Sequence, residues 1–145
     1  MVFNRGNRKD YDNWANTYGA IGWNYSSVLK YFIKFENNSD LNIVRENPGF
    51  HGTHGPVGIS SPNPPDPILV DALKACNSLG FKTTDLNGPQ QYGAAIGQMF
   101  TKNGLRASTS NSYLEPISKW FVYFHRVFCY KNIIQKLNCN WSGIY

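Results

Sequence analysis

The chain lacks several features that would assign it to a protein class at once. It has no run of 18 apolar residues that would mark a transmembrane helix. Its three cysteines, Cys76, Cys129 and Cys139, show no C-x-x-C spacing, and an odd number cannot pair completely within one chain, so they indicate no redox compartment. The N-terminus soon becomes charged and contains no apolar core of signal-peptide length. The sequence therefore predicts no secretion signal and leaves the localisation open.

Patterns typical of catalytic sites are also missing. No Ser/His/Asp, Cys/His or paired-carboxylate arrangement stands out, which argues against hydrolytic chemistry. The glycines at 49–52 and 93–97 do not form the G-x-G-x-x-G turn that brings backbone amides to a pyrophosphate. The sequence therefore supplies no recognisable phosphate-binding turn.

The spacing of the histidines and cysteines does not favour a zinc site. His51, His54, Cys129 and Cys139 would provide four ligands, but they lack the tight spacing of structural zinc sites. We instead expect a glycine-flanked turn in which His51 and His54 hydrogen-bond locally.

The positive charge is concentrated near the C-terminus. The formal net charge is +5, yet residues 1–117 carry ten Lys and Arg against nine Asp and Glu. Residues 118–145 carry four Lys and Arg and no acid, which accounts for the remainder. The near-neutral main body argues against a nucleic-acid partner. The basic cluster of Arg5, Arg8 and Lys9 is interpreted as a solvated helix start, because aspartates adjoin it.

Hydrophobic periodicity predicts two amphipathic helices. Asn24 is expected to cap the first, with Glu36 among the residues pointing away from its apolar stripe. Asp66 is expected to cap the second, Pro67 to occupy its first position and Gly80 to end it. Its apolar stripe, expected to be buried, comprises Leu69, Ala72, Leu73, Cys76 and Leu79.

The segments outside these helices are rich in turn-forming residues. Asp10 is expected to cap a short helix near the N-terminus, and residues 37–67 to be mostly turns around a short strand at 57–60. A further strand is proposed at 94–101, followed by a turn at Asn103 and Gly104. Together these patterns predict a mixed α/β fold.

Four segments in a fixed order carry a family resemblance. Residues 1–15 place Phe3, Gly6 and Asp12 at the spacing of an aromatic, a small and a polar residue in a flavoenzyme signature. Residues 23–32 are similar to a Trp-x-Tyr-x-x-Val-Leu-x-Tyr-Phe helix. Further segments are the His-Gly-x-x-Gly-Pro turn with its strand at 51–60, and residues 85–88 joined with 91–109, which end in Gly-x-Arg-x-Ser-Thr.

Over residues 1–117 the four segments resemble the glucose-methanol-choline (GMC) oxidoreductases, and most of all the animal glucose dehydrogenase (FAD, quinone) branch. The resemblance implies an incomplete α/β piece of the FAD-binding fold with part of the substrate domain. In family members the dinucleotide-binding unit lies upstream of the first segment, and the catalytic histidine lies far downstream. Many members are secreted.

The resemblance also implies a function. GMC enzymes oxidise the CH–OH group of an alcohol or sugar by hydride transfer to FAD and pass the electrons to quinone or oxygen. Met1, Val2, Phe3 and Asn4 correspond to residues beside the flavin, and no residue of this chain corresponds to a catalytic one. We therefore expect a fragment of such an enzyme that is inactive by itself and binds FAD poorly.

Residues 118–145 are expected to form a divergent tail. They are rich in aromatic and basic residues and do not resemble the family. We interpret residues 120–145 as translated intron or a shifted reading frame. The alternative function is a non-catalytic binding module whose basic aromatic tail contacts a membrane or a protein partner.

Overall fold

The computed structural model describes residues 1–118, which fall into two compact units. The first unit comprises Met1–Ser108, and the second begins at Thr109. In the second unit, residues Ser110–Leu114 form a π-helical turn (η1) and Glu115–Ile117 form a 3-10 turn (η2). Within residues 1–118, every helix is too short or too polar to cross a membrane.

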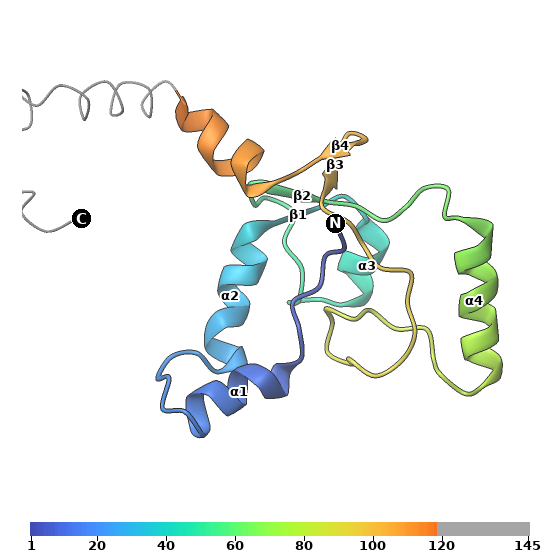
Figure 1. Cartoon of the computed structure of the whole chain (residues 1–145), viewed down its shortest axis with the longest axis horizontal. Helices are drawn as coiled ribbons and strands as arrows, with labels where there is room; N and C mark the ends of the chain where they lie inside the picture. The colour runs from blue at the N-terminus through green and yellow to red at the C-terminus, as the bar shows by residue number, and fades with distance from the viewer. Residues whose placement is uncertain (119–145) are drawn as a thin grey trace, which may run out of the picture. The chain divides into compact units, whose positions relative to one another are not determined.

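The first unit mixes short helices and short strands, as Figure 1 shows. The sequence-based prediction of a mixed α/β fold is confirmed. In chain order its elements are α1 (Arg8–Asn16), α2 (Tyr25–Phe35), β1 (Glu36–Asn38), α3 (Leu41–Glu46), β2 (Val57–Ile59), α4 (Pro67–Ser78), β3 (Thr101–Lys102) and β4 (Leu105–Arg106).

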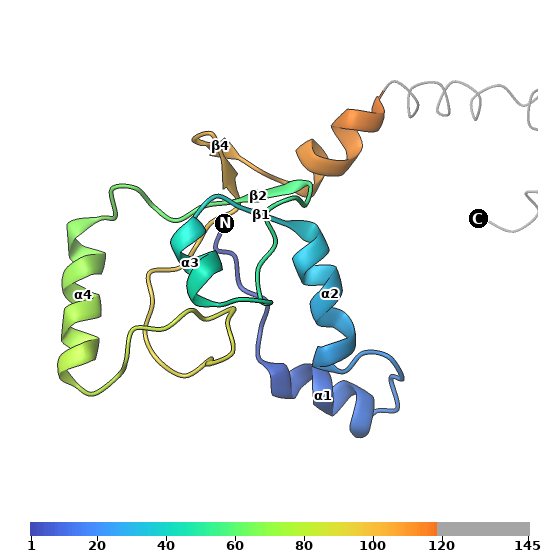
Figure 2. The same ribbon diagram turned by 180° about the vertical axis from the view of Figure 1, so that it is seen from behind.

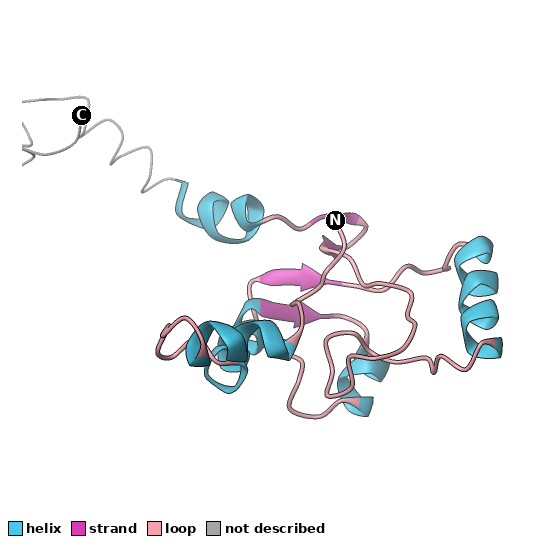
Figure 3. Cartoon of the chain, turned by 60° about the horizontal axis from the view of Figure 1, so that its bottom comes forward, coloured by secondary structure: helices cyan, strands magenta, loops and turns pink. Residues whose placement is uncertain are grey.

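Strands β1 and β2 form the centre of the first unit. They pair in parallel, with Asn37 opposite Gly58, and Figure 3 shows them side by side. Both side chains of β2 that flank Gly58 are fully buried. The apolar core gathers around this pair and comprises Phe3, Val57, Ile59 and Ala107, with Phe35 and Phe100 packed against it. This apolar core is small, and polar side chains are buried beside it.

Residues 98–100 lie between the N-terminal segment and the end of β2. On one side, the Phe3 amide donates to the Gln98 carbonyl at 2.7 Å and the Phe100 amide donates to the Met1 carbonyl at 3.0 Å. On the other side, Ser60 and Met99 exchange two backbone hydrogen bonds of 3.0 and 2.9 Å. These pairings are isolated bridges, so the strand proposed at 94–101 is wrong except at Thr101, the first residue of β3.

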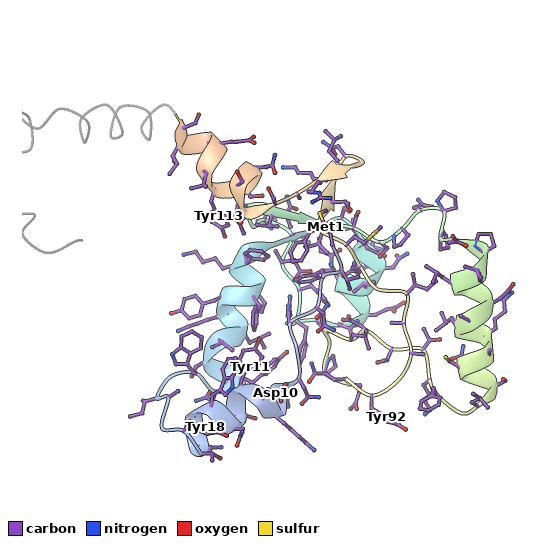
Figure 4. The ribbon with its side chains drawn as sticks, in the orientation of Figure 1. Met1, Asp10, Tyr11, Tyr18, Tyr92 and Tyr113 are labelled. Carbon is purple, nitrogen blue, oxygen red and sulfur yellow. The ribbon has the colours of Figure 1, made fainter. Side chains whose placement is uncertain are left out.

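Helices α1 and α2 pack through aromatic side chains. Asn7, rather than the expected Asp10, caps α1 by accepting a hydrogen bond from the Lys9 amide. The expected cap of α2 is confirmed, because the Asn24 side chain accepts from the Ser27 amide. Tyr11 on α1, labelled in Figure 4, makes an edge contact with Phe32 of α2 at 5.6 Å between ring centroids.

Helix α4 forms where the sequence predicts it but does not bury its apolar stripe. Asp66 accepts from the Ile68 amide, Pro67 opens the helix, and Gly80 follows its end with a φ of +91°. No residue of α4 is buried within the described chain, and Leu79 is 77% exposed. Figure 2 shows α4 standing apart from the other helices of this unit. The prediction of a buried stripe is therefore wrong for residues 1–118.

Residues 37–67 contain more regular structure than expected. The strand β2 is confirmed, but β1 and α3 were expected to be turns. Asp40 explains α3, because its carboxylate accepts from the Asn42 and Ile43 amides and so begins a helix. The turn at Asn103 and Gly104 is confirmed, with positive φ values of 52° and 75° joining β3 to β4.

Candidate functional site

The four residues expected beside a flavin are placed differently from one another. Met1 and Val2 expose 47% and 63% of their surface, whereas Phe3 is 5% exposed and belongs to the apolar core. Asn4 is exposed, and its side chain accepts a hydrogen bond from the Gly6 amide at 2.7 Å. Figure 4 shows Met1 beside the central strands. Of the four residues, Met1, Val2 and Asn4 therefore have exposed side chains, and Phe3 does not.

Arg5 follows this segment and is buried, with 3% of its surface exposed. Its Nη2 pairs with Glu36 Oε2, and its Nη1 donates to the Phe50 carbonyl at 2.5 Å. Its guanidinium also lies over the rings of Phe3 and Phe32, 5.4 and 5.6 Å from their centroids. The interpretation of Arg5 as part of a solvated basic cluster is wrong, because its charge is neutralised inside the fold.

Glu36 is the centre of a buried polar network. It is fully buried at the start of β1, and its two oxygens accept hydrogen bonds from several elements. Besides Arg5, Asn38 Nδ2 donates to Oε1 at 2.7 Å and His51 Nδ1 lies 2.8 Å from the same oxygen. The sequence places Glu36 in the helix, pointing away from its apolar stripe, but Glu36 directly follows α2 and is fully buried as the first residue of β1. The end of α2 turns inward at this residue.

His51 joins Glu36 to Asp85. Its Nε2 lies 2.6 Å from Asp85 Oδ2, and its side chain is completely buried. Burial alone would lower the pKa of His51, but hydrogen bonds to Asp85 and Glu36 and the charges of both carboxylates outweigh it and raise this pKa to about 9. The imidazole is therefore a cation at neutral pH and donates from both nitrogens.

Asp85 shows the opposite shift. Burial by itself raises the pKa of Asp85, yet hydrogen bonds from His51 and the Asn87 amide, with the charges of His51 and Arg5, lower this pKa below its ordinary value. The Asn87 amide donates to Asp85 Oδ1 at 2.9 Å. Two cations and two carboxylates are thus gathered in one buried chain of contacts.

An amide pair extends the network toward the N-terminal segment. Asn38 and Gln98 exchange two side-chain hydrogen bonds of 2.9 and 3.0 Å, and both residues are buried. Gln98 also accepts the Phe3 amide through its carbonyl. The network therefore reaches the residues that anchor positions 1–3.

A pocket of 470 Å³ opens where the network meets the surface. Among the residues that the structure describes, its lining includes Glu46 and Asp85 and no lysine or arginine. Leu73 of α4 and Ile43 of α3 form part of its wall. The described lining therefore combines acidic, amide and apolar residues.

The local hydrogen bonding expected of the two histidines is correct only for His54, which bonds the adjacent Thr53 at 2.8 Å. His51 bonds residues 15 and 34 positions away. No group of three or more potential ligands that could hold a metal occurs within residues 1–118, and the two cysteines of the rejected zinc arrangement lie outside that range.

Comparisons with known proteins identify the scaffold. The model of the family "GMC oxidoreductase" matches residues 1–135, a range that includes part of the segment expected to diverge after residue 117. Glucose dehydrogenase [FAD, quinone] of Drosophila melanogaster is 43% identical over 118 residues, which are 80% of this chain and 18% of that protein. Oxygen-dependent choline dehydrogenase of Brucella anthropi is 38% identical over 120 residues, 82% of this chain and 21% of that protein.

Solved structures show the same fold. Pyridoxine 4-oxidase from Mesorbium loti superposes with a TM-score of 0.70 at 23% identity, over 79% of this chain and 22% of that one. An FAD-dependent oxidoreductase from Chaetomium thermophilum gives a TM-score of 0.64 at 26% identity, over 82% and 22%. The chain spans about a fifth of the length of the curated relatives it matches. With a family match that covers most of its length, the chain belongs to the GMC oxidoreductase family.

Proposed function

We propose that this chain is part of an FAD-dependent oxidoreductase that oxidises the CH–OH group of an alcohol or sugar, and that Met1, Val2, Phe3 and Asn4 lie beside the flavin. Membership of the GMC family supports the reaction class. The relatives named above are dehydrogenases of glucose and choline, and the first carries FAD in its name. Quinone or oxygen is the proposed electron acceptor.

One observation carries the assignment of the flavin side. Met1 and Val2 are exposed apolar residues on a backbone that is anchored immediately beside them, because Met1 accepts from Phe100 and Phe3 donates to Gln98. An exposed apolar pair on a fixed backbone suits a flat, largely apolar ring. Phe3 offers such a ring only its backbone, since its side chain is in the core.

The described residues fit the ring of FAD better than its pyrophosphate. Arg5, the basic residue nearest this segment, is buried and paired with Glu36. The sequence also lacks the glycine-rich turn that cradles phosphates. We therefore propose that this chain contributes one face of the ring site and that the phosphates are held by residues other than those described.

The chain's own residues would position the cofactor and exclude water. FAD, when bound, supplies the redox chemistry by accepting a hydride. Neither described histidine is proposed as the base: His51 is already protonated at neutral pH, with both nitrogens donating to carboxylates. His54 is exposed and bonds Thr53. We propose that this chain alone does not turn over an alcohol.

Binding of two flavin probes to the purified chain tests the ring assignment. Lumiflavin carries the ring alone, whereas FAD adds the pyrophosphate. If only the ring is recognised, their dissociation constants should agree within about threefold, since no phosphate contact adds affinity. Binding of FAD on the order of a hundredfold tighter would contradict the proposal.

A matched pair of variants locates the ring site. Val2→Asp places a charge where the ring is expected and should weaken lumiflavin binding, whereas Ile68→Asp changes an apolar residue on α4 that is 71% exposed and should not. Equal effects of both changes would remove the assignment of Val2. Absorbance of bound flavin should also stay unbleached when glucose or choline is added. Bleaching would show that the chain catalyses without a further base.

A further inference from the structure

Both polar atoms of the Asn87 side-chain amide hydrogen-bond the backbone of the N-terminal segment. Its Oδ1 accepts from the Arg5 amide at 2.9 Å, and its Nδ2 donates to the Phe3 carbonyl at 3.3 Å. Asn87 is 3% exposed, so these bonds are shielded from water. A side-chain amide thus replaces a neighbouring strand next to residues 3–5.

Gln91 repeats this arrangement a few residues along. Its Nε2 donates to the Gly6 carbonyl at 2.8 Å, and its Oε1 accepts from the Arg8 amide at 2.8 Å. Residues 85–91 therefore lie alongside residues 3–8, and two of their amide side chains hydrogen-bond the backbone of that segment. Because these contacts are made to backbone atoms, they fix the position of the segment independently of its side chains.

Together with the buried network, the contacts of Asn87 form a closed ring of interactions that begins and ends at Arg5. The Arg5 guanidinium pairs with Glu36, and Glu36 contacts His51 Nδ1. His51 Nε2 contacts Asp85, which accepts the Asn87 amide, and the Asn87 side chain returns to the Arg5 backbone. Residues from four separate parts of the sequence are held together through one arginine.

We propose that Arg5 is a positioning residue whose closed ring of contacts with Glu36, His51, Asp85 and Asn87 fixes the segment Met1–Asn4 against residues 98–100. The positioning of Met1–Asn4 by Arg5 is independent of the proposed function. Only the role of that segment in binding a flavin rests on the proposed function. Arg5 points inward while Met1 and Val2 stay exposed, so it sets where they are presented without touching the ligand. The bidentate reach of a guanidinium explains why arginine, and not lysine, suits this position.

A purely structural role makes a different prediction from a positioning role. If Arg5 only neutralised Glu36, its loss would loosen all of the first unit equally. If it positions the segment, its loss should open the hydrogen bonds between residues 1–3 and 98–100 before the other bonds of residues 98–100. Native-state hydrogen exchange separates the two cases, because residues 98–100 carry both kinds of bond.

The test compares four amides in the full chain and in Arg5→Met. Phe3 and Phe100 report the bonds to the N-terminal segment, whereas Ser60 and Met99 report the bonds to the end of β2. We expect exchange at Phe3 and Phe100 to accelerate by at least about tenfold more than at Ser60 and Met99. Arg106→Met, which removes an exposed arginine of β4, should leave all four unchanged.

Two further variants keep the test decisive if Arg5→Met does not fold. Arg5→Lys keeps the charge but cannot reach Glu36 and the Phe50 carbonyl together, so it should show the same selectivity at a smaller amplitude. Glu36→Gln keeps the shape and removes the charge and should act at the same two amides. Uniform acceleration of all four amides, or none, in the folded variants would overturn the proposal. No flavin is present in this test, so its result is independent of the lumiflavin measurement.

Discussion

The pH dependence of stability offers the sharpest test of the buried network. The pKa of His51 is raised from 6.5 to about 9 in the folded chain, so folding favours its protonated form. A raised pKa contributes stability that is complete below the unfolded value near 6.5 and is lost as the pH rises through about 9. The folded chain should therefore become less stable over this alkaline interval.

The size of the loss follows from the shift. Each pKa unit corresponds to about 1.36 kcal/mol, so a rise from 6.5 to about 9 gives at most about 3 kcal/mol. His51 has no exposed side-chain surface, so solvent does not weaken its contacts with Glu36 and Asp85. The lowered pKa of Asp85 acts at the other end, because its contribution is present above its unfolded value of 3.8 and is lost as the pH falls below it.

Urea unfolding at a series of pH values, followed by tryptophan fluorescence, measures this profile. We expect highest stability between about pH 4 and 6.5 and a fall above that range. His51→Gln should lower stability at pH 6 and remove most of the alkaline slope. His54→Gln changes an exposed histidine beside the same turn and should leave both unchanged. An alkaline slope that survives in His51→Gln would refute the assignment of a charged, buried imidazolium.

Four further substitutions test the packing of the first unit, each by the urea midpoint relative to the unchanged chain. Gly52→Ala would place its Cβ 2.0 Å from the Ile33 carbonyl oxygen and should prevent stable folding, whereas Gly49→Ala meets open space at a φ of +83° and should cost about 1 kcal/mol. Asn24→Ala removes the cap of α2 and should cost about 1 kcal/mol. Ile59→Ala truncates a fully buried core residue and should cost about 2–5 kcal/mol.

The local elements of the fold could be predicted from the sequence because their signals are local. Asn24 and the Asp66–Pro67 pair begin helices at the expected residues, and Gly80 has the expected left-handed conformation. The strand at 57–59 was also recognisable from its apolar residues. Each of these features depends on neighbours within a few positions, so no tertiary information was needed.

The buried network could not be predicted in the same way. Arg5, Glu36, His51 and Asp85 are separated by up to 80 positions, and each alone resembles a solvated charge. Glu36 carried one usable signal, because it continues an apolar helix directly into a strand at the centre of the unit. His51 carried another, as it lies between a phenylalanine and a glycine. Neither signal names the partner, and only the tertiary fold supplies it.

The prediction that α4 buries its apolar stripe failed for a different reason. Its period correctly predicted a helix with one apolar face, but period does not say which surface covers that face. Within residues 1–118 the face is only partly covered: Leu73 and Cys76 are half-buried, whereas Leu69 and Leu79 are exposed. An amphipathic pattern predicts that a helix face is suited to burial. Whether that face is buried depends on which other segments pack against it.

The composition of the interior explains why a charged ring suits the role of holding a segment. Six apolar and six polar or charged residues are buried in the described chain, so apolar packing does not dominate the arrangement. Apolar contacts are non-directional and tolerate sliding, whereas a guanidinium that bonds both Glu36 and the Phe50 carbonyl fits few geometries. Breaking such a buried pair leaves an uncompensated charge and costs about 3–5 kcal/mol, so a displaced Arg5 is strongly disfavoured. The network therefore favours one position of residues 1–4 over its neighbours, which an apolar core of this size would not do.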